Sequence, residues 1–362
     1  YAFPHRKTQD FLFELFMTGC HEVAVLAAPW KKLGHQDTTK YRARLIDRPR
    51  PYGVEQICRS FGFPYYEVEH NDVDRIKKIQ VDHQFDFAII SGARILKREI
   101  VELFGEGILN FHPGKLPETS GLDAFYYAIK RRISQGVTAH FIDSRVDAGM
   151  QLFFHETDAL ADDTPETIQE RSYFSQIDAL RRFMDIRSNG QLHPLPVNRP
   201  SKNRPMSPDE KRAAIQDFSI WKSVRIVAQN TRDLFRACEA GTAEECREIL
   251  DRAPLLIEAR SPEGWTPLIV ACYNQKPNIV KMLLDRGADP NTSGAKGTTP
   301  LMYAKTKLLR ARNMNPEILS MLLGAGADLS RHDGFGKTVL EYVAESGDIS
   351  LHEWLSAKGR VA

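Results

Sequence analysis

Three residues of this 362-residue chain, Asn110, His112 and Asp147, have the side chains that acyl transfer to an amine requires. An imidazole can take up the amine's proton near neutral pH. An uncharged amide can donate to the oxygen that becomes negative, and a carboxylate can stabilise the charged imidazole or relay a proton. Singly, each is also an ordinary turn or loop residue. Their order, in Asn110-Phe111-His112-Pro113 and later Asp147-Ala148-Gly149, favours the catalytic interpretation.

A second histidine, His140, opens the run His140-Phe141-Ile142-Asp143 between these two motifs. The run is apolar enough to be a strand, so we expect His140 to be packed and hydrogen-bonded rather than catalytic.

The elements that must position these residues follow an alternating α/β pattern from Phe11 to about Leu192. We therefore predict a parallel, layered sheet. Because Asn110 and His112 come at the end of a predicted strand, they belong to the edge where open α/β sheets bind ligands. Strands are predicted at 23–27, 87–90, 107–111 and 137–143, and helices at 11–18, 53–61, 97–104, 123–129 and 164–188.

Composition and charge limit the function classes. Hydrophobic residues make up 42% and charged residues 27% of the chain, which is ordinary for a globular protein. A net charge of +2 is too balanced for a large polyanion-binding surface, so we expect no nucleic-acid partner. The five cysteines form no C-x-x-C pair, and no run is long enough to span a membrane, so we expect reduced thiols, no metal site and a cytoplasmic protein.

The chain changes character after residue 192. Five prolines between Leu192 and Pro208 predict an extended connection. Beyond it, Gly264-Trp265-Thr266-Pro267-Leu268 recurs as Gly297-Thr298-Thr299-Pro300-Leu301, an interval of 33 residues that is typical of ankyrin repeats. We therefore expect three parts: residues 1–192 as an α/β domain, 193–230 as a Pro-rich connection with helices, and 231–362 as an all-α ankyrin array.

The Asn-x-His-Pro motif with the later His-Phe-Ile-Asp and Asp-Ala-Gly closely resembles the formyltransferase family that uses N10-formyltetrahydrofolate. Members of that family formylate glycinamide ribonucleotide, methionyl-tRNA or nucleotide-linked amino sugars. The resemblance implies a Rossmann-like sheet domain, tetrahydrofolate as a product, and catalytic roles for Asn110, His112 and Asp147.

The resemblance also implies a pterin cleft. It would be lined by the run Ile90, Ser91, Gly92, Ala93, Arg94 and Ile95, and by the loop that begins at Asp143. Small residues in that run suit a close approach of backbone to ligand, although a plain strand-to-helix turn would also use them.

The amine is the least constrained part of the prediction. A formyltransferase core with an ankyrin array resembles bacterial enzymes that formylate dTDP-linked amino sugars for O-antigen, a part of lipopolysaccharide. We expect dTDP-3-amino-3,6-dideoxy-D-glucose as substrate, with the 4-amino and galacto isomers as alternatives. Candidate substrate-binding residues are Lys7, Lys202, Arg204 and Trp221, which equally suit a surface linker and solvated charges.

The array itself has two interpretations. Ankyrin grooves commonly bind proteins, but Trp265, Tyr273 and Tyr303 with nearby cations would also suit a second nucleotide ligand. We expect a homodimer. The competing hypothesis for the whole chain is a non-catalytic ankyrin adaptor on a formyltransferase fold.

Overall fold

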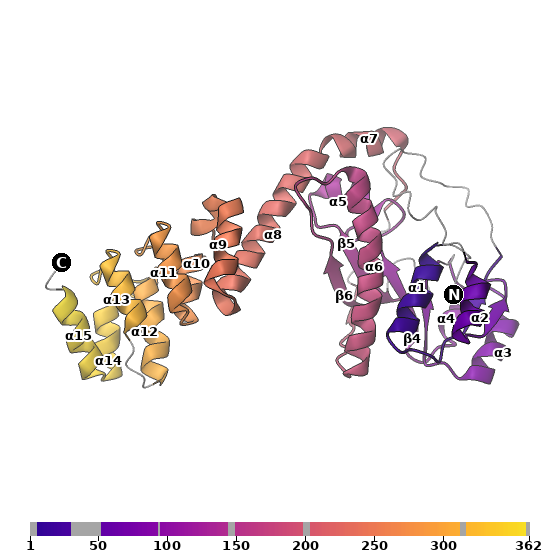
Figure 1. The fold of residues 1–362 in the computed structure, drawn as a ribbon, viewed down its shortest axis with the longest axis horizontal. Coiled ribbons are helices and arrows are strands. Elements are labelled where there is room, and N and C mark those ends of the chain that lie inside the picture. The colour runs from indigo at the N-terminus through magenta and orange to yellow at the C-terminus, as the bar shows by residue number, and fades with distance from the viewer. Residues whose placement is uncertain are drawn as a thin grey trace. The chain divides into compact units, whose positions relative to one another are not determined.

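The structure, a computed structural model, describes residues 6–29, 52–92, 95–143, 149–197, 203–311 and 316–359 (Figure 1). The chain divides into two compact units, Tyr1–Ile226 and Val227–Ala362. The division falls inside one helix, α8 (Phe218–Ala240). Each unit has its own hydrophobic core.

The first unit alternates helices and short strands, as the sequence predicted. Its strands are β1 (Val25–Ala27), β2 (Tyr65–Glu67), β3 (Phe87–Ile90), β4 (Gly107–His112), β5 (Gly136–Phe141), β6 (Met150–Glu156) and β7 (Leu195–Pro196). Its helices are α1 (Arg6–Met17), α2 (Val54–Phe61), α3 (Val73–His83), α4 (Arg98–Val101), α5 (Ala124–Arg131), α6 (Pro165–Ser188) and α7 (Pro208–Gln216).

The sheet corrects the expectation of a wholly parallel arrangement. Among the described residues the strands form a two-stranded parallel sheet, β1-β2, and a five-stranded sheet in the order β3-β4-β5-β6-β7. Only β3 and β4 are parallel in the larger sheet, while β5, β6 and β7 each run antiparallel to their neighbour. The reason is local: β5 and β6 follow each other through a short connection, which can join only antiparallel strands.

Helices cover both faces of the larger sheet. On one face, Leu109 and Phe111 of β4 pack with α1 and α6, including Phe11 and Phe183. Ile108 packs on the opposite face with residues of α3 and α4. Alternate residues of a strand point to opposite faces, so Asn110 and His112 share the face of Ile108.

The Pro-rich segment is tied to the first unit by buried polar contacts. Lys211 of α7 forms an ion pair of 2.7 Å with Asp123, just before α5, and both side chains are buried. The Met206 amide donates to the same carboxylate at 2.7 Å. A capping box at Ser207 and Glu210 starts α7, as the Ser-Pro sequence predicts.

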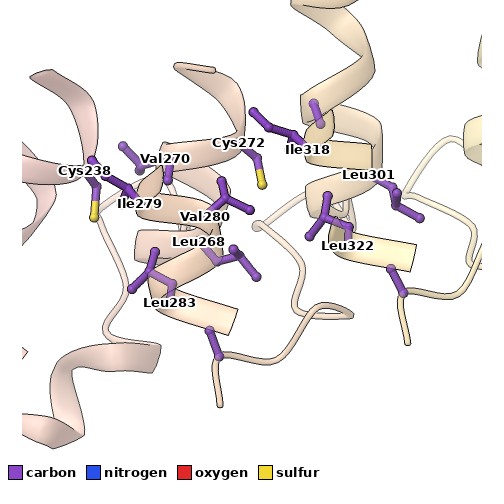
Figure 2. Packing of buried hydrophobic residues seen from close by; sticks show 14 of the residues in the cluster. Cys238, Leu268, Val270, Cys272, Ile279, Val280, Leu283, Leu301, Ile318 and Leu322 are labelled. Atoms are coloured by element: carbon purple, nitrogen blue, oxygen red, sulfur yellow. The ribbon is translucent and has the colours of Figure 1, made fainter. Parts of the chain in front are cut away.

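The second unit is helical throughout its described residues. It contains α9 (Ala243–Arg252), a 3₁₀ turn (Pro254–Glu258), α10 (Pro267–Tyr273), α11 (Pro277–Asp285), α12 (Pro300–Ala311), α13 (Glu317–Gly324), α14 (Val339–Ser346) and α15 (Ile349–Gly359). Thr266 caps α10 and Thr338 caps α14. Figure 2 shows the core that results, where Val270 and Cys272 of one repeat pack near Ile279 and Val280.

Candidate active site

Asn110 lies on β4, an inner strand of the larger sheet, between β3 and β5. It pairs with Ile90 at the end of β3 on one side and with His140 of β5 on the other. Its amide nitrogen lies 3.2 Å from Nε2 of His140. An Asn amide has two N–H groups, and this contact uses one of them. The half-buried amide can therefore donate its second N–H to a ligand.

His112 ends β4 and is buried, with 4% of its surface exposed. Its Nε2 lies 2.9 Å from the carbonyl oxygen of Thr119. A carbonyl only accepts hydrogen bonds, so Nε2 carries a proton. In the neutral imidazole this places the basic lone pair on Nδ1, the atom that would take up a proton.

His140 has no exposed surface and holds the Asn110 amide in place. This confirms the expectation that His140 is packed and hydrogen-bonded. A register shift between β5 and β6 falls between Ala139 and His140. Such bulges re-aim side chains and occur often beside active sites.

The loop after His112 depends on two residues that the sequence analysis did not single out. Thr138, opposite His112 in the β4-β5 ladder, donates to the Gly114 carbonyl at 2.6 Å and accepts from the Leu116 amide at 3.1 Å. A Cβ on Gly114 would lie 2.2 Å from Oγ1 of Thr119, so only glycine fits there. The sequence does contain a signal for Thr138. A threonine on a buried strand needs hydrogen-bond partners for its hydroxyl, and the backbone of the loop that follows the neighbouring strand can supply them.

The same loop is clamped from the Pro-rich segment by Asn203, which is 9% exposed. Its amide donates to the carbonyls of Glu118 and Ser120 at 3.0 and 2.8 Å, on either side of Thr119. Arg131 donates to Oδ1 of Asn203 at 2.7 Å and also to the Glu118 carbonyl. Asn203 thus fixes the carbonyl that contacts His112.

The expected pterin-binding run follows β3, next to Asn110. Ser91 is buried and its hydroxyl lies 2.9 Å from that of Thr8 in α1. Gly92 is half-buried, whereas the side chain of Ile95 is exposed, and its carbonyl accepts from Asn71 at 3.2 Å. Ala93 and Arg94 lie outside the described residues.

The structure describes both ends of the loop that contains Asp147. Ile142 donates to the Ile108 carbonyl at 2.9 Å, which places the start of the loop beside β4, and Asp143 follows. At the other end, a Cβ on Gly149 would lie 2.1 Å from the Phe141 carbonyl, so the two ends meet closely. Residues 144–148, and Asp147 with them, lie outside the described residues.

The three described members of the expected substrate-binding set, Lys7, Arg204 and Trp221, each have different contacts. Lys7 is half-buried in α1 with its ammonium 5.2 Å from the centroid of the Phe11 ring, and burial lowers the pKa of Lys7 to about 8. Arg204 is exposed, and Glu210 already engages its guanidinium at 2.9 and 2.5 Å. Lys202 lies outside the described residues.

Trp221 has a structural environment that argues against nucleotide stacking. Only 1% of its surface is exposed, its indole N–H donates to the Ile133 carbonyl at 2.8 Å, and its ring stacks on Phe218. Neither face is open to a ligand. The alternative considered from the sequence, a surface linker, does not describe Trp221 either, since the ring is part of a core.

The described part of the chain was searched for metal-binding groups and membrane-spanning helices. It contains no group of three or more His, Cys, Asp or Glu side chains placed to hold a metal, and no helix long and apolar enough to cross a membrane. The five cysteines are free thiols, and Cys238 and Cys246 have their sulfurs 3.8 Å apart in the first repeat.

Comparison with known proteins agrees with this geometry. Residues 43–183 match the formyl transferase family. Residues 234–309 match ankyrin repeats in three copies, and residues 296–334 match a single ankyrin repeat. The domain match spans β3, β4 and β5, the strands that carry the candidate site.

Relatives of the formyl transferase domain act on different amines, by their names. The chain is 27% identical over 146 residues to phosphoribosylglycinamide formyltransferase, chloroplastic, from Arabidopsis thaliana, covering 35% of this chain and 49% of that protein. It is 26% identical to the phosphoribosylglycinamide formyltransferase of Bacillus subtilis, covering 35% and 69%. It is 25% identical to the methionyl-tRNA formyltransferase of Thermodesulfovibrio yellowstonii, covering 44% and 52%. The chain thus spans about half the length of two of these relatives.

Among solved structures, the chain is similar to phosphoribosylglycinamide formyltransferase from Anaplasma phagocytophilum. The two share 19% identity over 52% of this chain and 85% of that one, with a TM-score of 0.40.

Proposed function

We propose that this protein transfers the formyl group of N10-formyltetrahydrofolate to the amine of a dTDP-linked amino-dideoxyhexose. The observation that carries the proposal is Asn110, whose amide is oriented by His140 and lies in the ladder between the end of β3 and β5. His112, two residues on, lies on the same face of the strand. The domain match supports formyl transfer in general.

The residues around the end of β3 fit a folate cosubstrate. Ile90 pairs with Asn110 in the parallel ladder, so Ser91 and Gly92 follow directly beside the reacting region. The folate supplies an activated one-carbon acyl group when bound. A ligand held by the backbone of this run would place its formyl group within reach of the Asn110 amide.

Each residue of the site then has one task. Asn110 donates its second N–H to the formyl oxygen as negative charge develops there, a contact worth about 3–4 kcal/mol in comparable sites. His112 accepts the proton of the attacking amine at Nδ1, because Thr119 fixes the Nε2–H tautomer. That proton passes to N10 of the folate as the bond between N10 and the formyl carbon breaks, which releases tetrahydrofolate. We propose that Asp147 stabilises the imidazolium that results.

A panel of amine substrates tests which amine the enzyme formylates. Tetrahydrofolate release would be measured with dTDP-3-amino-3,6-dideoxy-D-glucose, its galacto epimer, the 4-amino isomer, glycinamide ribonucleotide and methionyl-tRNA. We expect the first sugar to give a kcat/KM at least ~10-fold above the others, since a site built for one amine position misplaces another. A preference for the ribonucleotide or the tRNA would contradict the sugar assignment.

The choice of a sugar for O-antigen rests on the combination of domains. A formyl transferase domain is followed here by ankyrin repeats, and the net charge of +2 disfavours tRNA. Lys7, still largely protonated at pH 7, is a cation we propose for the diphosphate. Replacing Lys7 by Gln would raise KM for the sugar nucleotide and leave kcat unchanged.

The adaptor alternative makes an opposite prediction for the same chain. A non-catalytic adaptor would show no turnover with any amine and no effect of Asp147→Asn. We expect Asp147→Asn to abolish turnover without changing the thermal midpoint. Unchanged activity in this variant would remove Asp147 from the mechanism.

We further propose that the ankyrin array binds a protein or a second nucleotide, and that the enzyme is a homodimer. The rings of Trp265 and Tyr303 lie 4.7 Å apart and those of Trp265 and Tyr273 lie 5.2 Å apart, all three half-buried. A half-buried aromatic cluster suits either ligand. Titration of dTDP into the enzyme and into the Trp265→Ala variant distinguishes the two ligands, because only a nucleotide site on the array would lose dTDP binding in the variant. Sedimentation of the free enzyme tests the dimer.

A further inference from the structure

The chain turns sharply where it leaves β4 after His112. The Gly114 amide donates to the His112 carbonyl at 2.8 Å, which closes a three-residue turn around Pro113. The proline ring fixes φ, so the direction in which the chain continues depends on the ψ angle of Pro113. The loop that follows brings the Thr119 carbonyl back to within 2.9 Å of Nε2 of His112. The rotation of the Pro113 carbonyl is therefore one determinant of that contact.

The side chain of Gln135, between α5 and β5, holds this carbonyl. Its Nε2 donates to the Pro113 oxygen at 3.1 Å. The same amide nitrogen donates its second hydrogen to the hydroxyl of Ser172 in α6, at 3.0 Å. Only 2% of the surface of Gln135 and 4% of that of Ser172 are exposed. The Pro113 carbonyl thus has a buried donor that is itself anchored on a helix.

The backbone around Gln135 is held as well. The Trp221 indole of α8 donates to the carbonyl of Ile133, two residues earlier, at 2.8 Å. The carbonyl of Gln135 accepts from the amide of Thr157, which follows β6, at 2.9 Å. The donor therefore projects from a segment that is fixed both by α8 and by the end of β6.

The orientation of the Gln135 amide is set by Pro113 and Ser172. Its Oε1 is buried and has no hydrogen-bond partner among the described residues. Turning the amide over would place Oε1 against the Pro113 carbonyl, and two acceptors cannot hydrogen-bond to each other. Leaving a buried acceptor unpaired is destabilising. The contact with Pro113 is thus kept at the expense of Oε1, a local conflict of the kind that functional sites retain.

We infer that Gln135 is a positioning residue for the base His112 and acts on it through Pro113. Gln135 anchors the near end of the loop, and Asn203 anchors the end beside Thr119. With both anchors in place, the Thr119 carbonyl meets Nε2 and the lone pair of His112 stays on Nδ1. Without Gln135, the Pro113 carbonyl turns to solvent, because Pro113 is exposed, and both neutral tautomers of His112 become populated.

The effect on rate rests on the proposed function, whereas the effect on the imidazole needs no substrate. The test therefore begins with NMR of the ring nitrogens in protein made with isotope-labelled histidine, where His112→Asn identifies the His112 signals by their loss. Gln135→Met removes both donor hydrogens and the unpaired Oε1 at nearly equal size. Gln135→Glu places a carboxylate against the Pro113 carbonyl. We expect the Nε2–H tautomer in wild type and a mixture of tautomers in both variants.

Kinetics and stability of the same variants separate positioning from packing. We expect Gln135→Met to lower kcat at least ~10-fold with KM for the amine unchanged, because the base is displaced while substrate contacts remain. Its thermal midpoint should stay within about 4 °C of wild type, since the exposed Pro113 carbonyl can bind water instead. Ser175→Ala is the matched control on α6. Ser175 lies in a buried hydroxyl pair with Thr157 at 2.8 Å, so this variant should lose stability and keep both the tautomer and kcat.

Three results would overturn the inference. The first is an unchanged Nε2–H tautomer in both Gln135 variants, whatever their stability. The second is a changed tautomer with unchanged kcat. The third is the same mixture of tautomers in Ser175→Ala, since any loosening of α6 would then have this effect. Failure of the proposed function looks different: wild type would transfer no formyl group, while Gln135→Met would still change the tautomer, which supports the positioning of His112.

Discussion

At the scale of single residues, the proposed formyl transfer depends most on Asn110. Its neighbours fix its orientation, because His140 takes one N–H and the parallel pairing with β3 holds the strand. Replacing Asn110 removes a donor from Nε2 of the buried His140, so some stability is lost together with activity. The loss of activity should be much the larger of the two.

We predict that Asn110→Ala lowers kcat by about 10²–10³-fold, the cost of one donor to a developing oxyanion. KM for the amine should change little, and the thermal midpoint should fall by about 2–8 °C, because the buried Nε2 of His140 loses its donor. Asn189→Ala, at the exposed end of α6, is the matched control and should leave both parameters unchanged. A loss confined to KM would show that Asn110 binds substrate without stabilising the transition state.

Lys7 gives a prediction on pH. Burial lowers the pKa of Lys7 from its ordinary 10.5 to about 8, so the folded state disfavours the charged amine. The cost is fully present below pH 8 and is relieved as pH rises toward 10.5. Lys7→Met should raise the free energy of unfolding at pH 7 by about 1 kcal/mol and flatten its rise between pH 8 and 10. Equal stability at pH 7 would show that the amine stays hydrated.

At the scale of elements, the loop between β4 and α5 is positioned from outside. Asn203 donates to two carbonyls of this loop, and Thr138 of β5 donates to a third, that of Gly114. The Pro-rich segment is thus part of the catalytic scaffold rather than a spacer. Asn203, in this segment, acts on His112 through the loop that carries the Thr119 carbonyl.

We predict that Asn203→Ala costs about 1–3 kcal/mol of stability, because the Glu118 and Ser120 carbonyls lose a buried donor. As a positioning residue it should also shift the pH dependence of kcat, since a displaced Thr119 carbonyl no longer fixes the His112 tautomer. Asn203→Asp retains the acceptor for Arg131 and should recover part of the stability. An unchanged pH profile with reduced stability would make Asn203 purely structural.

The sequence predicted the elements that carry strong patterns. Strand β3 has the predicted bounds, and α6 begins at the predicted cap, Thr164. Strand β6 was missed because nearly all of its residues are half-buried. Its sequence therefore lacks the alternation of apolar and polar residues that identifies a strand. Helix α3 was missed because it buries only Ile76 and Ile79.

The candidate site was predictable only in part. Asn110 and His112 are named by a local motif, but the contact with His140 depends on the register between β4 and β5, which no local pattern specifies. The Thr119 carbonyl is a backbone atom and leaves no side-chain signal. The buried place of Trp221 likewise depends on how α8 packs against α5.

At the scale of the whole molecule, the cores of the two units are separate. The ankyrin core draws its residues from 234–355, and the cores of the first unit from 11–221. No described residue belongs to both sets. Each unit should therefore unfold with its own cooperativity.

We predict two thermal transitions that respond to different caps. Thr266→Ala removes the buried cap of α10 and should lower only the ankyrin transition, by about 1 kcal/mol or about 4 °C. Ser207→Ala, the cap of α7, should lower only the transition of the first unit. A single transition that both variants shift equally would show that the units fold together.

Formyl transfer by Asn110 and His112, near the carboxyl end of β4, can be tested directly by one experiment. Wild type, Asn110→Ala and His112→Ala would be mixed with N10-formyltetrahydrofolate and dTDP-3-amino-3,6-dideoxy-D-glucose, and the formylated sugar and tetrahydrofolate would be quantified together. We predict equal amounts of both products from wild type, with at least ~100-fold less from either variant while folate still binds. Binding of folate without any formylated amine from wild type, or full activity in both variants, would contradict the account.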